Sequence, residues 1–183
     1  MDDTGAALEW ARSDEARQLG VDAKHIVLAG HSLGGATVLA TAAHSSGIEG
    51  LVPIDAWNPA STAAKAAQAS SDDRVKFRSE FSSYGPSLRL KSKDGVADEL
   101  LAHGHEWDLA KWAPSVAHVP ILSVSAKYAN GAENMRLAGS FRQAGNSRVD
   151  AIVMDTDHSF TDHRIALESA IVRWLQKLHR SKP

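Results

Sequence analysis

The chain has 183 residues, of which 43% are hydrophobic and 23% are charged, and its formal net charge is −2. This length and composition predict one globular domain over residues 1–183, with one substantial core. The small net charge and the lack of a basic block argue against nucleic acid or an anionic membrane as a partner. The chain has no cysteine, which excludes disulfides, a cysteine nucleophile and thiolate metal sites.

The N-terminus gives no sign of a targeting segment. It reads Met-Asp-Asp-Thr-Gly, which is acidic and lacks an apolar core of signal-peptide length. No stretch of the chain reaches the roughly 18 continuous apolar residues that a membrane helix needs. We therefore expect a cytoplasmic protein without a membrane partner.

The chain opens with a helix and a buried strand. Residues 5–20 have the periodicity of an amphipathic helix that turns Leu8 and Leu19 toward a core. Residues 26–29 are all apolar, as expected of a strand covered on both faces. A Gly-rich turn follows, and the small apolar residues 36–43 predict a helix packed closely on the sheet.

Strands and helices then alternate. Further strands are predicted at residues 50–55, 119–125 and 149–154, although Pro53 lacks the N–H group that a ladder requires. Helices are predicted at residues 135–144 and 161–178. This alternation indicates an α/β fold with an open, mostly parallel sheet that is flanked by helices.

Residues 58–115 differ from the rest of the chain. Stretches rich in alanine and serine alternate there with charged and helix-like pieces, and no clean strand interrupts them. We interpret this segment as a helical cap inserted into the domain, rather than as a second domain.

A Gly-x-Ser-x-Gly motif stands between the first strand and its helix. It reads Gly30-His31-Ser32-Leu33-Gly34. On such a sharp turn the serine adopts strained backbone angles that expose its hydroxyl, and the two glycines let strand and helix approach each other. The N–H of Leu33, at the positive end of the helix dipole, would receive a developing oxyanion.

A serine nucleophile needs a base, and histidine is the usual one near neutral pH. His158 follows the last predicted strand, where the order of a Ser…His hydrolase places the base. His163 falls within the start of the last helix, and we expect His31 to point into the sheet.

Two sets of side chains have the residue types that can ligate a metal ion. One is the His-x-His pair His103 and His105, and the other is Asp157, His158, Asp162 and His163. Neither has a convincing ligand set, so we expect no metal and no cofactor.

The acid that orients the histidine has two candidates. Asp55 ends the second predicted strand, at the sheet edge where sites of open α/β folds form. Glu133 is the first carboxylate after the third strand, where Lys127 and Tyr128 occupy the positions directly after the strand. We favour Asp55 over Glu133 and leave both open.

Two segments carry a family resemblance. Ile-Val-Leu-Ala-Gly-His-Ser-Leu-Gly-Gly at residues 26–35 and Asp-Thr-Asp-His-Ser-Phe-Thr-Asp-His-Arg at residues 155–164 resemble the nucleophile and histidine segments of α/β-hydrolases. The dienelactone-hydrolase-like and prolyl-oligopeptidase-like branch is the most similar. The resemblance implies the α/β-hydrolase fold, with Ser32 as nucleophile and His158 as base. It does not supply the acid, because Lys127 and Tyr128 stand where the family has aspartate.

The resemblance also implies strands that this chain lacks. The family places about four strands before the nucleophile strand, and only one helix precedes residue 26 here. We expect the loop that supplies the second oxyanion N–H to be missing with them. The first strand would then be an exposed sheet edge, open to association. The hypothesis is that the chain is the C-terminal part of a longer enzyme or a truncated product.

The expected function is hydrolysis of a small-molecule carboxylic ester or amide through a serine–histidine–acid triad and an acyl-enzyme. A short acyl ester is favoured over a peptide, because the predicted cap has few large apolar residues besides tryptophans. The alternative is a catalytically weak or inactive remnant whose fold serves binding or association.

Overall fold

The computed structural model describes residues 2–83 and 92–180 of the chain. The chain divides into two compact units. The first combines Met1–Trp57 with Trp112–Pro183, and the second is Asn58–Lys111.

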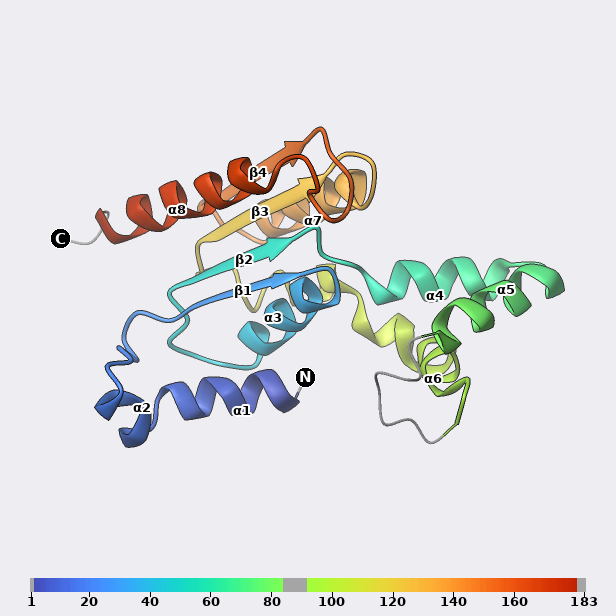
Figure 1. The fold of residues 1–183 in the computed structure, drawn as a ribbon, viewed down its shortest axis with the longest axis horizontal. Coiled ribbons are helices and arrows are strands. Elements are labelled where there is room, and N and C mark those ends of the chain that lie inside the picture. Colours follow the sequence, from blue (N-terminus) through green and yellow to red (C-terminus); the bar gives the residue numbers. More distant parts are fainter. Residues whose placement is uncertain (1, 84–91, 181–183) are drawn as a thin grey trace. The chain divides into compact units, whose positions relative to one another are not determined.

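The first unit is built on a parallel sheet of four strands in the order β1-β2-β3-β4 (Figure 1). The strands are β1 (Val27–His31), β2 (Gly50–Ile54), β3 (Ile121–Ala126) and β4 (Val149–Met154). This arrangement confirms the predicted open α/β sheet, and the predicted strand at 149–154 has the observed bounds. The other strands shift by one to two residues at their ends.

Helices cover both faces of this sheet (Figure 1). Helix α3 (Leu33–Ala43), between β1 and β2, and helix α7 (Gly131–Gln143), between β3 and β4, lie on one face, and α8 (Arg164–Arg180) lies on the other. The helices of the first unit are α1 (Asp2–Ala11), α2 (Asp14–Gln18), α3 (Leu33–Ala43), α7 (Gly131–Gln143) and α8 (Arg164–Arg180).

The N-terminal helix differs from its prediction. The expected helix over residues 5–20 is two helices, because the Ser13 side chain accepts the N–H of Ala16 and caps a new start. Leu8 is buried as expected, but Leu19 is 71% exposed. The prediction for Leu19 was wrong because the break resets which residues face the core.

The core on the α8 face joins that helix to the middle of the sheet. Trp174 of α8 is 7% exposed and belongs to one cluster with Val52 of β2 and with Leu122 and Val124 of β3. Leu167, Ile171 and Leu178 of α8 pack against the same cluster. Their spacing of three to four residues puts these side chains on one stripe of the helix.

Pro53 lies in β2, which pairs with β1 on one side and β3 on the other. The N–H of Leu51 donates to the carbonyl of Pro120, directly before β3, at 2.9 Å, and the N–H of Asp55 donates to that of Val124 in β3 at 2.7 Å. Since alternate residues of a strand face the same neighbour, position 53 also faces β3, where proline has no N–H to donate. One ladder bond is lost, and the bonds on either side keep the register.

The second unit is helical in the part that the structure describes. Its elements are α4 (Pro59–Gln68), α5 (Ser71–Ser82), α6 (Gly95–His103), η2 (Gly104–Trp107) and η3 (Leu109–Trp112), the last of which ends at the first residue past the boundary. Residues 84–91 of the predicted cap lie outside the described residues. The role of a cap stays a prediction.

Among the described helices of both units, none combines the length and the apolar character that crossing a membrane requires.

The turn between β1 and α3 depends on two glycines, only one of which belongs to the predicted pair. A Cβ on Gly30 would lie 2.2 Å from the carbonyl oxygen of Gly34, and one on Gly35 would lie 2.8 Å from the Cβ of Ala56. A Cβ on Gly34 would meet nothing within 4 Å. The prediction that Gly34 permits close packing was therefore wrong, and Gly35 has this role.

We predict that Gly35→Ala lowers the free energy of unfolding by about 1–3 kcal/mol, because its methyl group meets Ala56 in a packed turn. Gly34→Ala is the matched control and should leave stability unchanged or raise it by up to about 1 kcal/mol. Urea unfolding followed by circular dichroism measures both. Equal destabilisation by the two variants would contradict this account of the turn.

Candidate active site

Side chains of the types used in acid–base and nucleophilic catalysis lie at the carboxyl edge of the sheet. Ser32 directly follows β1, Asp55 directly follows β2, and His158 lies in the loop after β4. Because all four strands run parallel, these chain positions share one edge. The only non-glycine residues with positive φ in the described chain, Ser32, Asp55 and Phe160, also follow these strands. Strained backbone of this kind is characteristic of functional sites.

Ser32 has φ 58° and ψ −119°, which is the strained geometry expected from its motif. Its backbone is held from both sides. The N–H of Ser32 donates to the Ile54 carbonyl at 2.9 Å, and its own carbonyl accepts N–H groups from Gly35 and Trp57, each at 3.0 Å. The end of β2 thus fixes the conformation of the serine that ends β1.

Leu33 is the first residue of α3. The first N–H groups of a helix have no acceptor within that helix. The Leu33 N–H is therefore one of the donors beside Ser32 to which a negatively charged oxygen can bind.

Asp55 is fully buried, with 0% of its surface exposed. Its Oδ1 accepts the N–H of Ala126 at 2.9 Å. Its Oδ2 accepts the backbone N–H and the side-chain amide of Asn130, at 3.5 and 3.4 Å. The same Asn130 amide donates to the main-chain carbonyl of Asp55 at 3.1 Å. These donors compensate the burial of a carboxylate.

His158 is a further hydrogen-bond partner of this carboxylate. Its Nδ1 lies 2.5 Å from Oδ2 of Asp55, and its ring is 40% exposed. An Nδ1–H bonded to a carboxylate leaves Nε2 as the nitrogen able to accept a proton. Of the two carboxylates that the sequence leaves open, Asp55 is the one paired with His158 in the structure. Glu133 lies in the first turn of α7.

His31 holds the other side of His158. Its Nε2 donates to the main-chain carbonyl of His158 at 2.7 Å, and the two ring centroids are 4.5 Å apart. The expectation that His31 points into the sheet was wrong, since the residue is exposed and packs beside His158. Its bond links the residue before Ser32 to the residue expected to act as base.

The loop that carries His158 is closed by local hydrogen bonds. The hydroxyl of Thr156 donates to Asp162, and Asp157 accepts the N–H and the hydroxyl of Thr161 at 3.0 and 2.8 Å. The hydrogen bond from the Thr156 hydroxyl, and to a smaller extent the one from His163, lowers the pKa of Asp162 to about 2. These bonds fix the loop from both ends around the histidine.

Neither of the two candidate ligand sets forms a metal-binding cluster among the described residues. Within residues 2–83 and 92–180, only one group of three His or carboxylate side chains has its ligand atoms close enough to hold a metal ion. It consists of His25, Glu49 and His179. The His103 and His105 pair and the Asp157 to His163 set are not among them.

The profile of a family described as alpha/beta hydrolase fold matches residues 1–160. A comparison with curated proteins gives no match.

Several solved structures share the fold. An esterase from Pyrococcus furiosus aligns with 97% of this chain at 16% identity and a TM-score of 0.61, and 60% of that protein is covered. An enol-lactonase from Burkholderia xenovorans LB400 aligns with 81% at 22% identity and a TM-score of 0.52, with 64% covered. An acetyl xylan esterase from Paenibacillus sp. R4 aligns with 96% at 18% identity and a TM-score of 0.57, with 51% covered. The chain thus spans between about half and two thirds of these proteins.

We predict that Thr156→Val raises the pKa of Asp162 from about 2 toward its ordinary value of 3.8, because the Thr156 hydroxyl is the main cause of the shift. A lowered pKa in the folded state stabilises the fold above the ordinary value, and this contribution is lost as the pH falls toward 2. Carboxyl-carbon NMR titration measures the pKa. Asp157, whose pKa is lowered chiefly by Thr161, is the internal control. An unchanged Asp162 pKa in the variant would contradict the assignment.

Proposed function

Because this chain belongs to the alpha/beta hydrolase fold family, we propose that it is a serine hydrolase that cleaves a carboxylic ester. Ser32 is the nucleophile, His158 the general base and Asp55 the acid that orients it. The observation that carries the proposal is the bond between buried Asp55 and Nδ1 of His158, at the sheet edge where the strained Ser32 lies.

The reaction proceeds through an acyl-enzyme. Oγ of Ser32 attacks the ester carbonyl while Nε2 of His158 takes the hydroxyl proton. The N–H of Leu33 stabilises the oxyanion of the tetrahedral intermediate. As the intermediate collapses, His158 returns the proton to the departing alcohol. Water, deprotonated by His158, then attacks the acyl group, and His158 returns this proton to Oγ of Ser32 as the second tetrahedral intermediate releases the acid.

Asp55 contributes to this cycle by orienting His158. Its carboxylate keeps the proton of the neutral ring on Nδ1, so that Nε2 faces the reaction, and it stabilises the imidazolium that forms. The bonds from Ala126 and Asn130 keep Asp55 in place as His158 changes charge. Asn130 and His31 are therefore positioning residues for the proposed triad.

An ester of a short acid is the favoured substrate over an amide. The similar solved structures include two esterases and an enol-lactonase, which supports ester chemistry. The predicted cap supplies few large apolar side chains besides tryptophans for a long acyl chain. No cofactor enters this mechanism.

We predict that a fluorophosphonate probe labels the folded wild-type protein on Ser32, because only a serine activated by a base reacts readily with it. Ser32→Ala should abolish labelling, and mass spectrometry of the labelled peptide identifies the site. Exposed Ser83→Ala is the control and should label like wild type. A folded wild-type sample that stays unlabelled would favour the alternative of an inactive remnant that serves binding.

We predict that Asp55→Asn lowers kcat for p-nitrophenyl acetate by about 10⁴-fold, because the ring loses the tautomer and the charge partner that the reaction needs. Glu133→Gln should change kcat by less than about threefold, since the proposed triad does not use it. Circular dichroism of both variants checks that they fold. The reverse ranking of the two folded variants would transfer the role of the acid to Glu133.

A further inference from the structure

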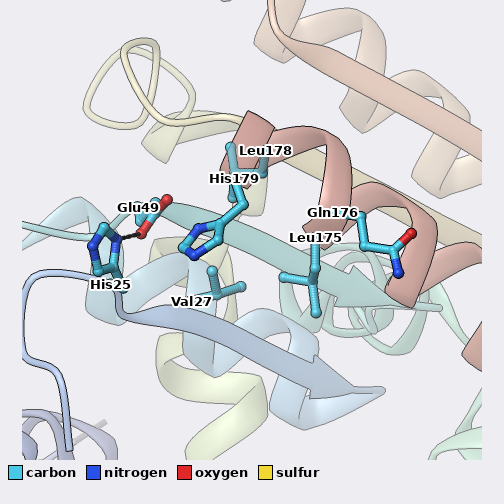
Figure 2. A pocket seen from close by; sticks show the side chains of 7 residues that line it. All are labelled: His25, Val27, Glu49, Leu175, Gln176, Leu178 and His179. Atoms are coloured by element: carbon cyan, nitrogen blue, oxygen red, sulfur yellow. Dashed lines mark hydrogen bonds and ion pairs between the residues drawn. The ribbon is translucent and has the colours of Figure 1, made fainter. Parts of the chain in front are cut away.

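A second cluster of ligand-type side chains lies at the opposite ends of the strands. His25 precedes β1, Glu49 directly precedes β2, and His179 lies in the last turn of α8. Figure 2 shows the three side chains turned toward one another across a shallow hollow. One ligand atom from each lies within 4.8 Å of the others. Three separate segments of the chain therefore converge here.

The contacts within this cluster are close. Nδ1 of His25 lies 2.8 Å from Oε2 of Glu49, and the ring centroids of His25 and His179 are 5.2 Å apart in an edge-to-face arrangement. The side chain of Glu49 is only 8% exposed, whereas that of His25 is 37% exposed. A nearly buried carboxylate is thus held beside two imidazoles.

The surroundings favour a bound ion over a purely solvated group of charges. The cluster lines a hollow of about 320 Å³, whose other walls are Val27, Leu175, Gln176 and Leu178 (Figure 2). Three of these four side chains are aliphatic, and aliphatic walls reduce the access of water to a charged group and strengthen its attraction to a cation.

We propose that His25, Glu49 and His179 form a binding site for a divalent transition metal, with Zn²⁺ as the preferred ion. Two imidazoles and one carboxylate are a common zinc ligand set, with a fourth position left for water. Ligand atoms on a tetrahedral zinc are roughly 3.3 Å apart, given metal–ligand distances of about 2.0–2.2 Å. The ligand atoms lie within 4.8 Å of one another, so binding requires side-chain rotations of the histidines that shorten these separations.

An outer partner for His25 is also in place. Oδ2 of Asp22 lies 3.8 Å from Nε2 of His25. When Nδ1 of a histidine binds a metal, a carboxylate near Nε2–H orients the ring and strengthens the ligand. Asp22 would assume this position with a small movement of the loop that contains both residues.

The proposed site is structural and separate from the active site. Strands β1 and β2 each have five residues, which at 3.3 Å per residue separate their two ends by roughly 16 Å. His25 and Glu49 precede these strands, and Ser32 and Asp55 follow them. A bound metal would join the last turn of α8 to the two segments that enter the sheet, and would thereby stabilise the fold.

The test uses the 183-residue chain without a histidine tag, treated with EDTA and then dialysed. Isothermal titration calorimetry should show that one Zn²⁺ binds per chain. Zn²⁺ at 100 times its Kd should raise Tm by about 5–10 °C, whereas equal Mg²⁺ should not. Co²⁺ in place of Zn²⁺ should give the visible absorption of a four-coordinate site.

His179→Ala and Glu49→Gln should each weaken Zn²⁺ binding by at least about 100-fold and remove the Tm shift. His44→Ala, which removes an exposed histidine at the end of α3, is the matched control and should bind like wild type. Circular dichroism without metal checks the folding of each variant. Absence of Zn²⁺ binding by wild type, or binding by both cluster variants equal to that of the His44 variant, would overturn the proposal.

Discussion

The buried carboxylate of Asp55 is the constraint on which the active edge of this protein depends. A charge with no exposed surface is costly unless it is paired and hydrogen-bonded. Here the donors come from Ala126 at the end of β3, from Asn130 before α7, and from His158 after β4. Satisfying this one group therefore requires the ends of three neighbouring strands to hold fixed positions.

The same arrangement accounts for the strained backbone at this edge. Ser32, Asp55 and Phe160 all have positive φ, a conformation that costs on the order of 1–3 kcal/mol for such residues. The bond from Ser32 N–H to Ile54 and the bonds of Asp55 hold two of them against this cost. The sheet core around Val52 and Val124, which is fully buried, provides the rigid base.

Much of this organisation could be predicted from local patterns. Apolar runs identified the four strands because parallel strands are buried on both faces, and the serine turn and the histidine loop follow from chain order. The contacts of Asn130 and His31 could not be predicted, because they depend on which loops meet in space. The break before α2 and the role of Gly35 depend on a single cap and on one Cβ contact, which periodicity does not reveal. The cluster of His25, Glu49 and His179 joins positions far apart in the chain for the same reason.

The most direct test of the central claim is the proton NMR signal of the His158 ring. An Nδ1–H bonded to a buried carboxylate is protected from exchange and strongly shifted to low field. In protein with ¹⁵N-labelled histidine, we expect the low-field signal of His158 in wild type and in Glu133→Gln, and its loss in Asp55→Asn. A signal that persists in folded Asp55→Asn, or that disappears in Glu133→Gln, would contradict the account.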